Sequence, residues 1–169
     1  SNVTTLSARD ATEALTATMK VVGNEIGHAD MALDAWSETE ARHAITAADM
    51  ANAIKKSAAA AKNAGFTFNE LNGIVAGIGA VTRQTGKEVG TAMRFIARRI
   101  FSEKGPKSLA EIQIPTVTGA GENRRGFDIL SDLSMKWDEL TNAQKLNIAQ
   151  SLGGTRQYNA LLVAMDNWD

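Results

Sequence analysis

A glycine pair, Gly153-Gly154, set between two short apolar helical patterns is the feature that most constrains this chain. Thr141 is placed to cap the first helix, and Gln144 three residues later completes a capping box. The glycines end this helix because glycine adopts the left-handed cap conformation at little cost, and Thr155 restarts a helix at once. So short a link predicts that the second helix folds back on the first. The apolar side chains expected to meet are Leu146, Ala149 and Leu152 from the first helix, and Tyr158, Leu161, Leu162 and Met165 from the second.

Caps and apolar residues at helical spacing predict five helices before residue 103. The third begins at Thr46 with Asp49 three residues on, and the fourth begins at Thr67 with Glu70 in the equivalent place. A break at Thr85-Gly86 separates the fourth helix from the fifth, and these two are expected to form a helical hairpin. The expected helices run from 7 to 23, from about 29 to about 43, from 46 to 65, from 67 to 85 and from 87 to about 102.

Two glycines of the fourth helix, Gly73 and Gly77, lie four residues apart and therefore open the same face. A glycine inside a helix costs about 1 kcal/mol relative to alanine unless close packing compensates. We therefore expect these helix-packing glycines to form a groove where the backbone of another helix approaches.

The helical period disappears between Glu103 and Arg125, where glycines and prolines supply breakers. Residues 112–117 are predicted to form one short strand, with 122–125 returning beside it. An isolated hairpin is marginally stable, so this one is expected to lie on the helices. The loop 119–126 lacks the spacing of nucleotide-binding loops and contains an acid, so it is interpreted as a hairpin tip. A further helix follows, with Phe127, Leu130, Leu133 and Trp137 on one face.

The predicted fold is mainly α, an irregular bundle of about seven to eight helices with one short β-hairpin. Low aromatic content, 5%, and abundant alanine favour close-packed helices over a sheet sandwich. The length of 169 residues suits a single domain, 1–169, with possible sub-lobes at 3–102 and 103–169. The apolar helix that runs up to Trp168-Asp169 leads us to expect that the natural protein continues.

Composition removes several classes of function. The net charge of −1 gives no global argument for binding nucleic acid or an anionic membrane, and no cysteine is present for disulfides or thiolate chemistry. The most apolar run, 74–81, is far shorter than the roughly 20 residues that span a bilayer.

The residues that carry enzyme chemistry lack the required spacing. His28 and His43 are the only histidines and have no His-x-x-x-His partner, and no Gly-x-Ser-x-Gly elbow is present. Glu70, Asp128 and Glu139 are interpreted as ordinary surface acids. We therefore predict no catalytic residue, no cofactor and no metal.

A row of basic residues on the fifth helix is the strongest candidate interaction face. Lys87, Arg94 and Arg98 are seven and four residues apart, so they project in nearly one direction, and Arg83 and Arg99 lie near them. The row is suited to nucleic-acid phosphates. A solvated helix face explains it equally well and is the interpretation we prefer. Pairing with acids such as Asp128 and Asp132, within the protein or on a partner, is a third interpretation.

Two runs at the C-terminal end resemble a known family. Leu-Thr-Asn-Ala-Gln at 140–144 followed by Ala-Gln-Ser-Leu-Gly-Gly-Thr-Arg-Gln-Tyr-Asn at 149–159 is similar to the core domain of phage tail tape measure proteins. Segments 11–17, 64–71 and 90–94 fall in the order of that family, and the resemblance covers nearly the whole chain.

The resemblance implies a structural role in the virion tail. The full-length protein of that family sets tail length while the tube polymerises around it, and later assists genome delivery. The implied partners are tail-assembly, tail-tube or tail-tip proteins, with self-association as a further possibility, and the implied locations are the virion tail and the host cytoplasm during assembly. The competing hypothesis is a helical nucleic-acid-binding or protein-interaction module that uses the basic face.

The same C-terminal run supplies a structural motif, formed by Gly153, Gly154, Thr155, Arg156, Gln157, Tyr158 and Asn159. Its polar side chains are expected to hydrogen-bond backbone groups left open at two adjoining helix ends. The ring of Tyr158 is expected to be buried while its hydroxyl finds a partner.

Overall fold

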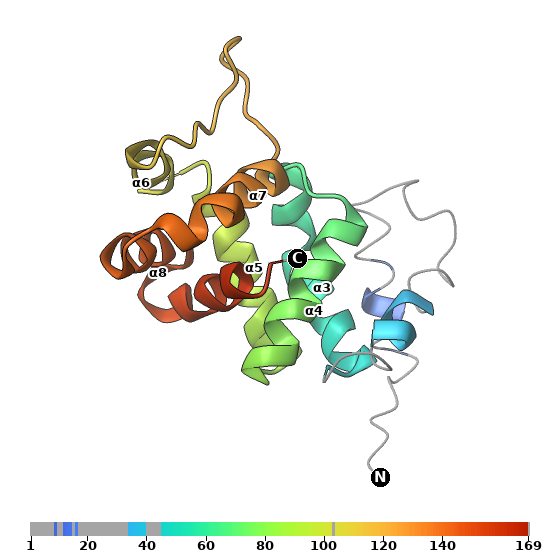
Figure 1. Cartoon of the computed structure of the whole chain (residues 1–169). Helices are drawn as coiled ribbons and strands as arrows, with labels where there is room; N and C mark the ends of the chain where they lie inside the picture. Colours follow the sequence, from blue (N-terminus) through green and yellow to red (C-terminus); the bar gives the residue numbers. More distant parts are fainter. Residues whose placement is uncertain are drawn as a thin grey trace.

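The computed structural model describes residues 9, 12–14, 16, 34–39, 45–102 and 104–168. Its helices are α3 (Ala47–Asn63), α4 (Phe68–Thr82), α5 (Gly86–Arg99), α6 (Gly105–Glu111), α7 (Gly126–Lys136), the 3-10 helix η2 (Trp137–Glu139) and α8 (Asn142–Asp166). The predicted mainly α fold, an irregular multi-helix bundle, is confirmed (Figure 1). The described residues before 40 are helical, as the first two predicted helices require. The remainder of those two helices, with His28 and His43, lies outside the described residues.

Threonine caps set the first residues of α3, α4 and α5. The hydroxyls of Thr46, Thr67 and Thr85 each accept a hydrogen bond from the backbone amide three residues on, at 3.0, 3.2 and 3.3 Å. The capping box is complete at Thr67 and at Thr85, where the carboxylate of the glutamate three residues on accepts a hydrogen bond from the backbone amide of the threonine. The two threonine caps predicted for the third and fourth helices are therefore confirmed.

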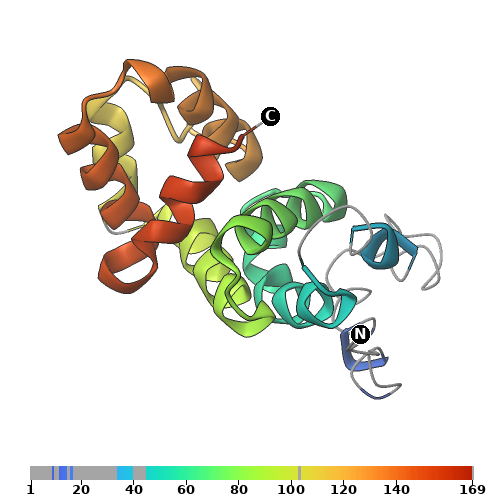
Figure 2. The same ribbon diagram turned by 60° about the horizontal axis from the view of Figure 1, so that its bottom comes forward.

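Helix α5 lies at the centre of the fold. It packs most extensively on α3 and next on α8, and it also contacts α4, as the predicted helical hairpin requires. Figure 2 shows α3 and α4 on one side and α6, α7 and α8 on the other, with α5 between them. Buried side chains from both groups, including Met93 and Ile96 of α5, belong to one hydrophobic core cluster. The sub-lobes 3–102 and 103–169 stay a prediction.

Helix α6 corrects the sequence analysis, which placed no helix between residues 103 and 125. Pro106 lies in its first turn, where an amide hydrogen is not needed for the helical hydrogen bonds. Leu109 is fully buried and holds this short helix on the core. Gly105 and Pro106 thus begin a helix instead of preventing one.

The predicted β-hairpin is reduced to one antiparallel bridge, between Val117 and Asn123. The amide of Thr118 donates to the carbonyl of Glu122 at 2.7 Å, but no strand is present in the described residues. The expectation that the hairpin lies on the helices is wrong. Residues 117–123 are exposed, and the turn projects away from the helices at the top of Figure 1. Buried Ile114 fixes the base instead, so the turn itself needs no packing.

The break predicted at Gly153-Gly154 is confirmed. Gly154 interrupts α8 with φ 75° and ψ 174°, a conformation that is essentially restricted to glycine. A Cβ on Gly153 would lie 2.8 Å from the Cα of Tyr158, so the chain passes too close to itself there for any side chain. Thr141 and Gln144 form the predicted capping box. Figure 2 shows the resulting change of direction within α8.

Candidate interaction surfaces

Two glycines of α5 bring this helix into close contact with the backbone of α3. A Cβ on Gly86 would collide with the backbone of Asp49, and a Cβ on Gly90 would lie 2.7 Å from both the Ala53 carbonyl oxygen and the Lys56 Cβ. Because the earlier glycine meets the earlier part of α3, the two helices run in the same direction. The spacing of four residues puts both glycines on one face of α5.

The interpretation of Gly73 and Gly77 as helix-packing glycines stays a prediction. No described residue comes within 4 Å of a Cβ built on either of them, so the described helices make no close approach there. Gly73 is exposed and Gly77 is half-buried. In the described part of the chain, the glycine pair with this spacing that packs against a helix backbone is Gly86 and Gly90.

Most of the side chains that flank the contact between α3 and α5 are basic. They line a groove of about 370 Å³, which we call the cation groove: Asn52, Lys55 and Lys56 from α3 with Lys87 and Arg94 from α5. The basic row predicted on α5 therefore contributes Lys87 and Arg94 to this groove, and α3 supplies two lysines that the sequence analysis did not select. The α3 lysines belong here because Gly90 brings Lys56 against α5.

Ion pairing is sparse among the groove cations. Lys55 contacts the carboxylate of Glu13 at 2.5 Å, and Arg9 contacts the same carboxylate at 3.1 Å. Hydrogen bonds from Lys55 and then Arg9 hold the pKa of Glu13 below its ordinary value. Within the described ranges, no carboxylate lies within 4.0 Å of the charged nitrogens of Lys56, Lys87 or Arg94.

The other predicted basic residues lie in different surroundings. Arg98 is exposed on α5, and Arg83 is exposed at the end of α4 with φ 55°. Arg99 faces the α8 break instead. Its guanidinium stacks over Phe95 with 5.5 Å to the ring centroid, and a Cβ on Gly154 would lie 3.2 Å from its Nη1. Arg99 therefore supports the structural motif and does not extend the cation groove.

The acids considered as partners for the basic row bind other arginines. Asp132 pairs with Arg124 at 2.6 Å. Arg125 contacts Glu70 at 2.6 Å and Asp128 at 3.4 Å, and its Nε donates to the Gly65 carbonyl at 3.0 Å. These contacts join α4 to the start of α7. Asp128 and Asp132 thus have partners outside the basic row, and pairing of the row with other acids or with a partner protein stays a prediction.

The polar residues of the structural motif do not act as expected. In the part of the chain that the structure describes, the side chains of Arg156, Gln157 and Asn159 make no hydrogen bond to the neighbouring helix ends. The turn in the motif instead depends on the backbone geometry of Gly153 and Gly154. Tyr158 is partly buried and packs on the core.

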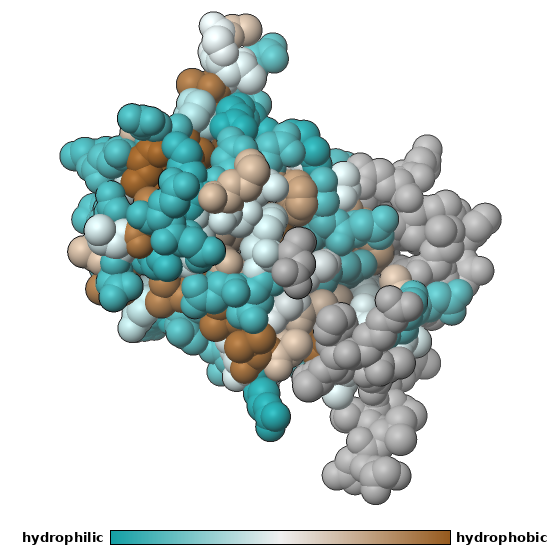
Figure 3. Space-filling model, in the orientation of Figure 1, coloured by the Kyte–Doolittle hydropathy of each residue, from teal (hydrophilic) through white to brown (hydrophobic). Residues whose placement is uncertain are grey.

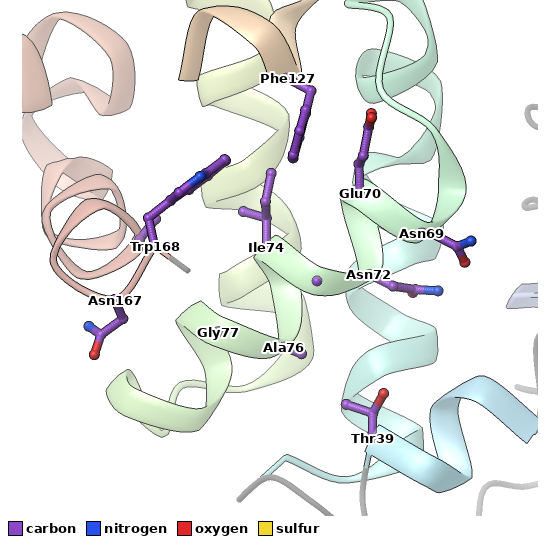
Figure 4. Close-up of a pocket in the computed structure, with 12 residues that line it drawn as sticks. Thr39, Asn69, Glu70, Asn72, Ile74, Ala76, Gly77, Phe127, Asn167 and Trp168 are labelled. Atoms are coloured by element: carbon purple, nitrogen blue, oxygen red, sulfur yellow. The ribbon is translucent and has the colours of Figure 1, made fainter. Parts of the chain in front are cut away.

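A second surface feature, which we call the apolar groove, crosses α4 beside α7 and the end of α8. Its volume is about 570 Å³, and Gly73 and Gly77 lie in its lining. Figure 4 shows Phe127 and Trp168 beside Ile74 at one end, with Asn69 and Thr39 toward the other. The Phe127 and Trp168 rings lie 5.5 Å apart. The glycines thus open a groove, as the sequence suggested, although no described helix occupies it.

The rest of the visible surface is mainly polar. Figure 3 shows apolar residues gathered in small separate areas on the face of Figure 1. The large apolar residues that are exposed, Val81, Val117, Met135 and Leu146, belong to different elements. Among the described residues, no three His, Asp or Glu side chains gather in a way that could hold a metal ion. None of the described helices combines the length and apolar character needed to cross a bilayer.

Comparison with known families decides the protein class. A sequence model of phage-related minor tail proteins matches residues 1–154. The chain belongs to the phage-related minor tail protein family. Membership of this minor tail protein family supports a structural role in the phage tail and a place in the virion tail. No solved structure matches the chain.

Proposed function

We propose that this chain is the core segment of a tape measure protein, which contributes to tail assembly, tail-length determination and genome delivery. The observation that carries the proposal is the run 140–159, whose resemblance to tape measure core domains adds to the family match. The run builds a specific structure, in which a capped helix turns sharply at Gly154 and packs on α5. Long helical regions elsewhere in such a protein would measure length, and this segment would engage tail proteins.

The apolar groove is the surface that we assign to an amphipathic helix of another tail protein. Its apolar end, with Ile74, Phe127 and Trp168, is bordered by polar residues such as Asn69 and Asn167, which is the arrangement of protein interfaces. Gly73 and Gly77 leave the α4 backbone open to a close helix contact. A partner helix with apolar residues at spacings of three and four fits this surface.

Light scattering with purified tail-tube and tail-tip proteins tests the proposal. We expect a complex with one of them over a concentration series, and the partner identifies the end of the tail that this segment serves. Gly77→Leu should abolish that complex, because its Cβ meets no described atom within 4 Å and the rest of its side chain extends into the groove. Gly119→Leu is the matched control, since Gly119 lies in the projecting turn with equal space around it. A monomer indifferent to both proteins would contradict the proposal.

A further inference from the structure

The cation groove brings together like charges, and for most of them no described residue supplies a compensating acid. Gly90 lets α3 and α5 approach closely, and this approach places Lys56 level with the part of α5 between Lys87 and Arg94. Juxtaposed cations repel each other unless an anion lies between them. Lys55 has Glu13 as a partner, but Lys56, Lys87 and Arg94 have no described carboxylate within 4.0 Å. The groove is therefore arranged to receive negative charge from another molecule.

The lining of the cation groove distinguishes between classes of anionic partner. It consists of four basic side chains and Asn52, with no aromatic or aliphatic residue. Protein interfaces are commonly centred on buried aromatic anchors, and the lining of this groove offers none. Phosphate groups of nucleic acids need only cations and amide donors, which is what the groove contains.

The basic surface also continues beyond the groove. Arg98 follows Arg94 by four residues on the same face of α5 and is exposed. The row from Lys87 to Arg98 covers about 16 Å at 1.5 Å per residue. That length spans several successive phosphates of one strand, so the groove residues and Arg98 can contact a backbone together.

We propose that the cation groove binds the phosphate backbone of duplex nucleic acid, through Lys55, Lys56, Lys87 and Arg94 with Asn52. The binding has no base preference, because every contact is made to phosphates. This activity is separate from the proposed binding of a tail protein in the apolar groove. The two surfaces share no lining residue, so one can be removed without the other.

Fluorescence anisotropy with a labelled 20-base-pair duplex tests the proposal over a series of salt concentrations. Four phosphate contacts predict a slope of log K against log salt of about −3.6, which weakens binding roughly 150-fold between 50 and 200 mM salt. Duplexes of unrelated sequence should bind equally. Failure to bind duplex at the lowest salt concentration, or a slope near zero, would overturn the proposal.

Charge-reversal variants locate the binding surface. Lys56→Glu with Lys87→Glu should reduce duplex affinity at least 100-fold at low salt. The matched control is Lys107→Glu with Arg156→Glu, which makes the same charge change at exposed positions of α6 and α8 and should leave most of the affinity. Equal losses in both double variants would show a net-charge effect and refute the assignment. The neutral pair Lys56→Gln with Lys87→Gln, checked by circular dichroism, gives the same test if charge reversal disturbs the fold.

A polyglutamate peptide with the same net charge as the duplex tests the alternative that the groove binds an acidic protein. The proposal requires weaker binding of this peptide than of the duplex at equal salt. Tighter binding of the peptide would overturn it in favour of an acidic protein partner. The complex with tail proteins is measured on the same variants, and its survival in the Lys56 and Lys87 variants shows that the two activities are independent.

Discussion

The carboxylate of Asp49 in the first turn of α3 accepts a hydrogen bond from the backbone amide of Gly86, the first residue of α5, at 2.8 Å. The same carboxylate accepts a hydrogen bond from the Thr46 hydroxyl at 3.0 Å. One side chain thus caps a second helix 37 residues away and sets how α5 is placed along α3. That placement puts Lys87 and Arg94 on either side of Lys56.

Asp49→Ala should destabilise the fold by about 1–2 kcal/mol, because the amide of Gly86 and the hydroxyl of Thr46 both lose an acceptor. Urea unfolding followed by circular dichroism measures the change. Asp49→Asn keeps an oxygen at the same position and should recover most of the stability. If the asparagine variant is as unstable as the alanine variant, the hydrogen bond to Gly86 is not the cause.

Gly90→Ala and Gly77→Ala should change stability in opposite directions, although both replace a glycine inside a helix. Alanine is worth about 1 kcal/mol in helix propensity, and at Gly77 no described atom opposes the added methyl. At Gly90 the methyl would lie 2.7 Å from the Ala53 carbonyl oxygen, and such overpacking costs about 1–3 kcal/mol. We expect a higher melting temperature for Gly77→Ala and a lower one for Gly90→Ala. Parallel shifts would contradict the close contact between α3 and α5.

Gly154→Ala should destabilise the chain by about 1–3 kcal/mol, because φ 75° with ψ 174° is not accessible to alanine without strain. The added methyl would also approach the Arg99 guanidinium to 3.2 Å. Thermal unfolding compares this variant with Gly119→Ala, which has open space around it and should unfold near the wild-type temperature. Equal melting temperatures for the two variants would show that the break in α8 tolerates a side chain.

The ion pair of Glu13 should stabilise the fold less as the pH is lowered. Its pKa is lowered in the folded state, so its small stabilising effect is present above the ordinary carboxyl pKa and is lost as pH falls through the folded pKa. Lys55→Ala removes the main cause and should raise the pKa of Glu13 toward its ordinary value. Carboxyl titration by NMR measures this shift directly. Lys62→Ala, a matched change on the same helix, should leave the titration of Glu13 where it is.

Local chemistry explains which elements the sequence predicted well. The caps at Thr46, Thr67 and Thr141 depend on residues three positions apart, and the break at Gly154 depends on the backbone freedom of glycine. Each of these patterns involves only a few neighbouring residues, so it can be recognised without knowledge of the fold. Helix α6 was missed because Gly105-Pro106 is typical of turns, while its packing through Leu109 depends on distant residues.

The candidate sites show the same limit. Lys87, Arg94 and Arg98 could be grouped from their spacing on one helix, whereas Lys55 and Lys56 join them only through the packing of α3 on α5. Basic residues on one face of a single helix can be recognised from their spacing, but the residues that a second helix adds to the same surface cannot. For the same reason the sequence could not distinguish Gly73 and Gly77, which line a groove, from Gly86 and Gly90, which touch a backbone.

The projecting turn at 117–123 is a suitable site for attaching a label to the protein. Its residues are exposed and bury no core side chain, while Ile114 and the pairing of Arg124 with Asp132 hold its base. A peptide tag or a fluorophore attached between Gly119 and Gly121 should therefore leave the helices intact. A probe at this point would report on assembly from a fixed position, clear of both grooves.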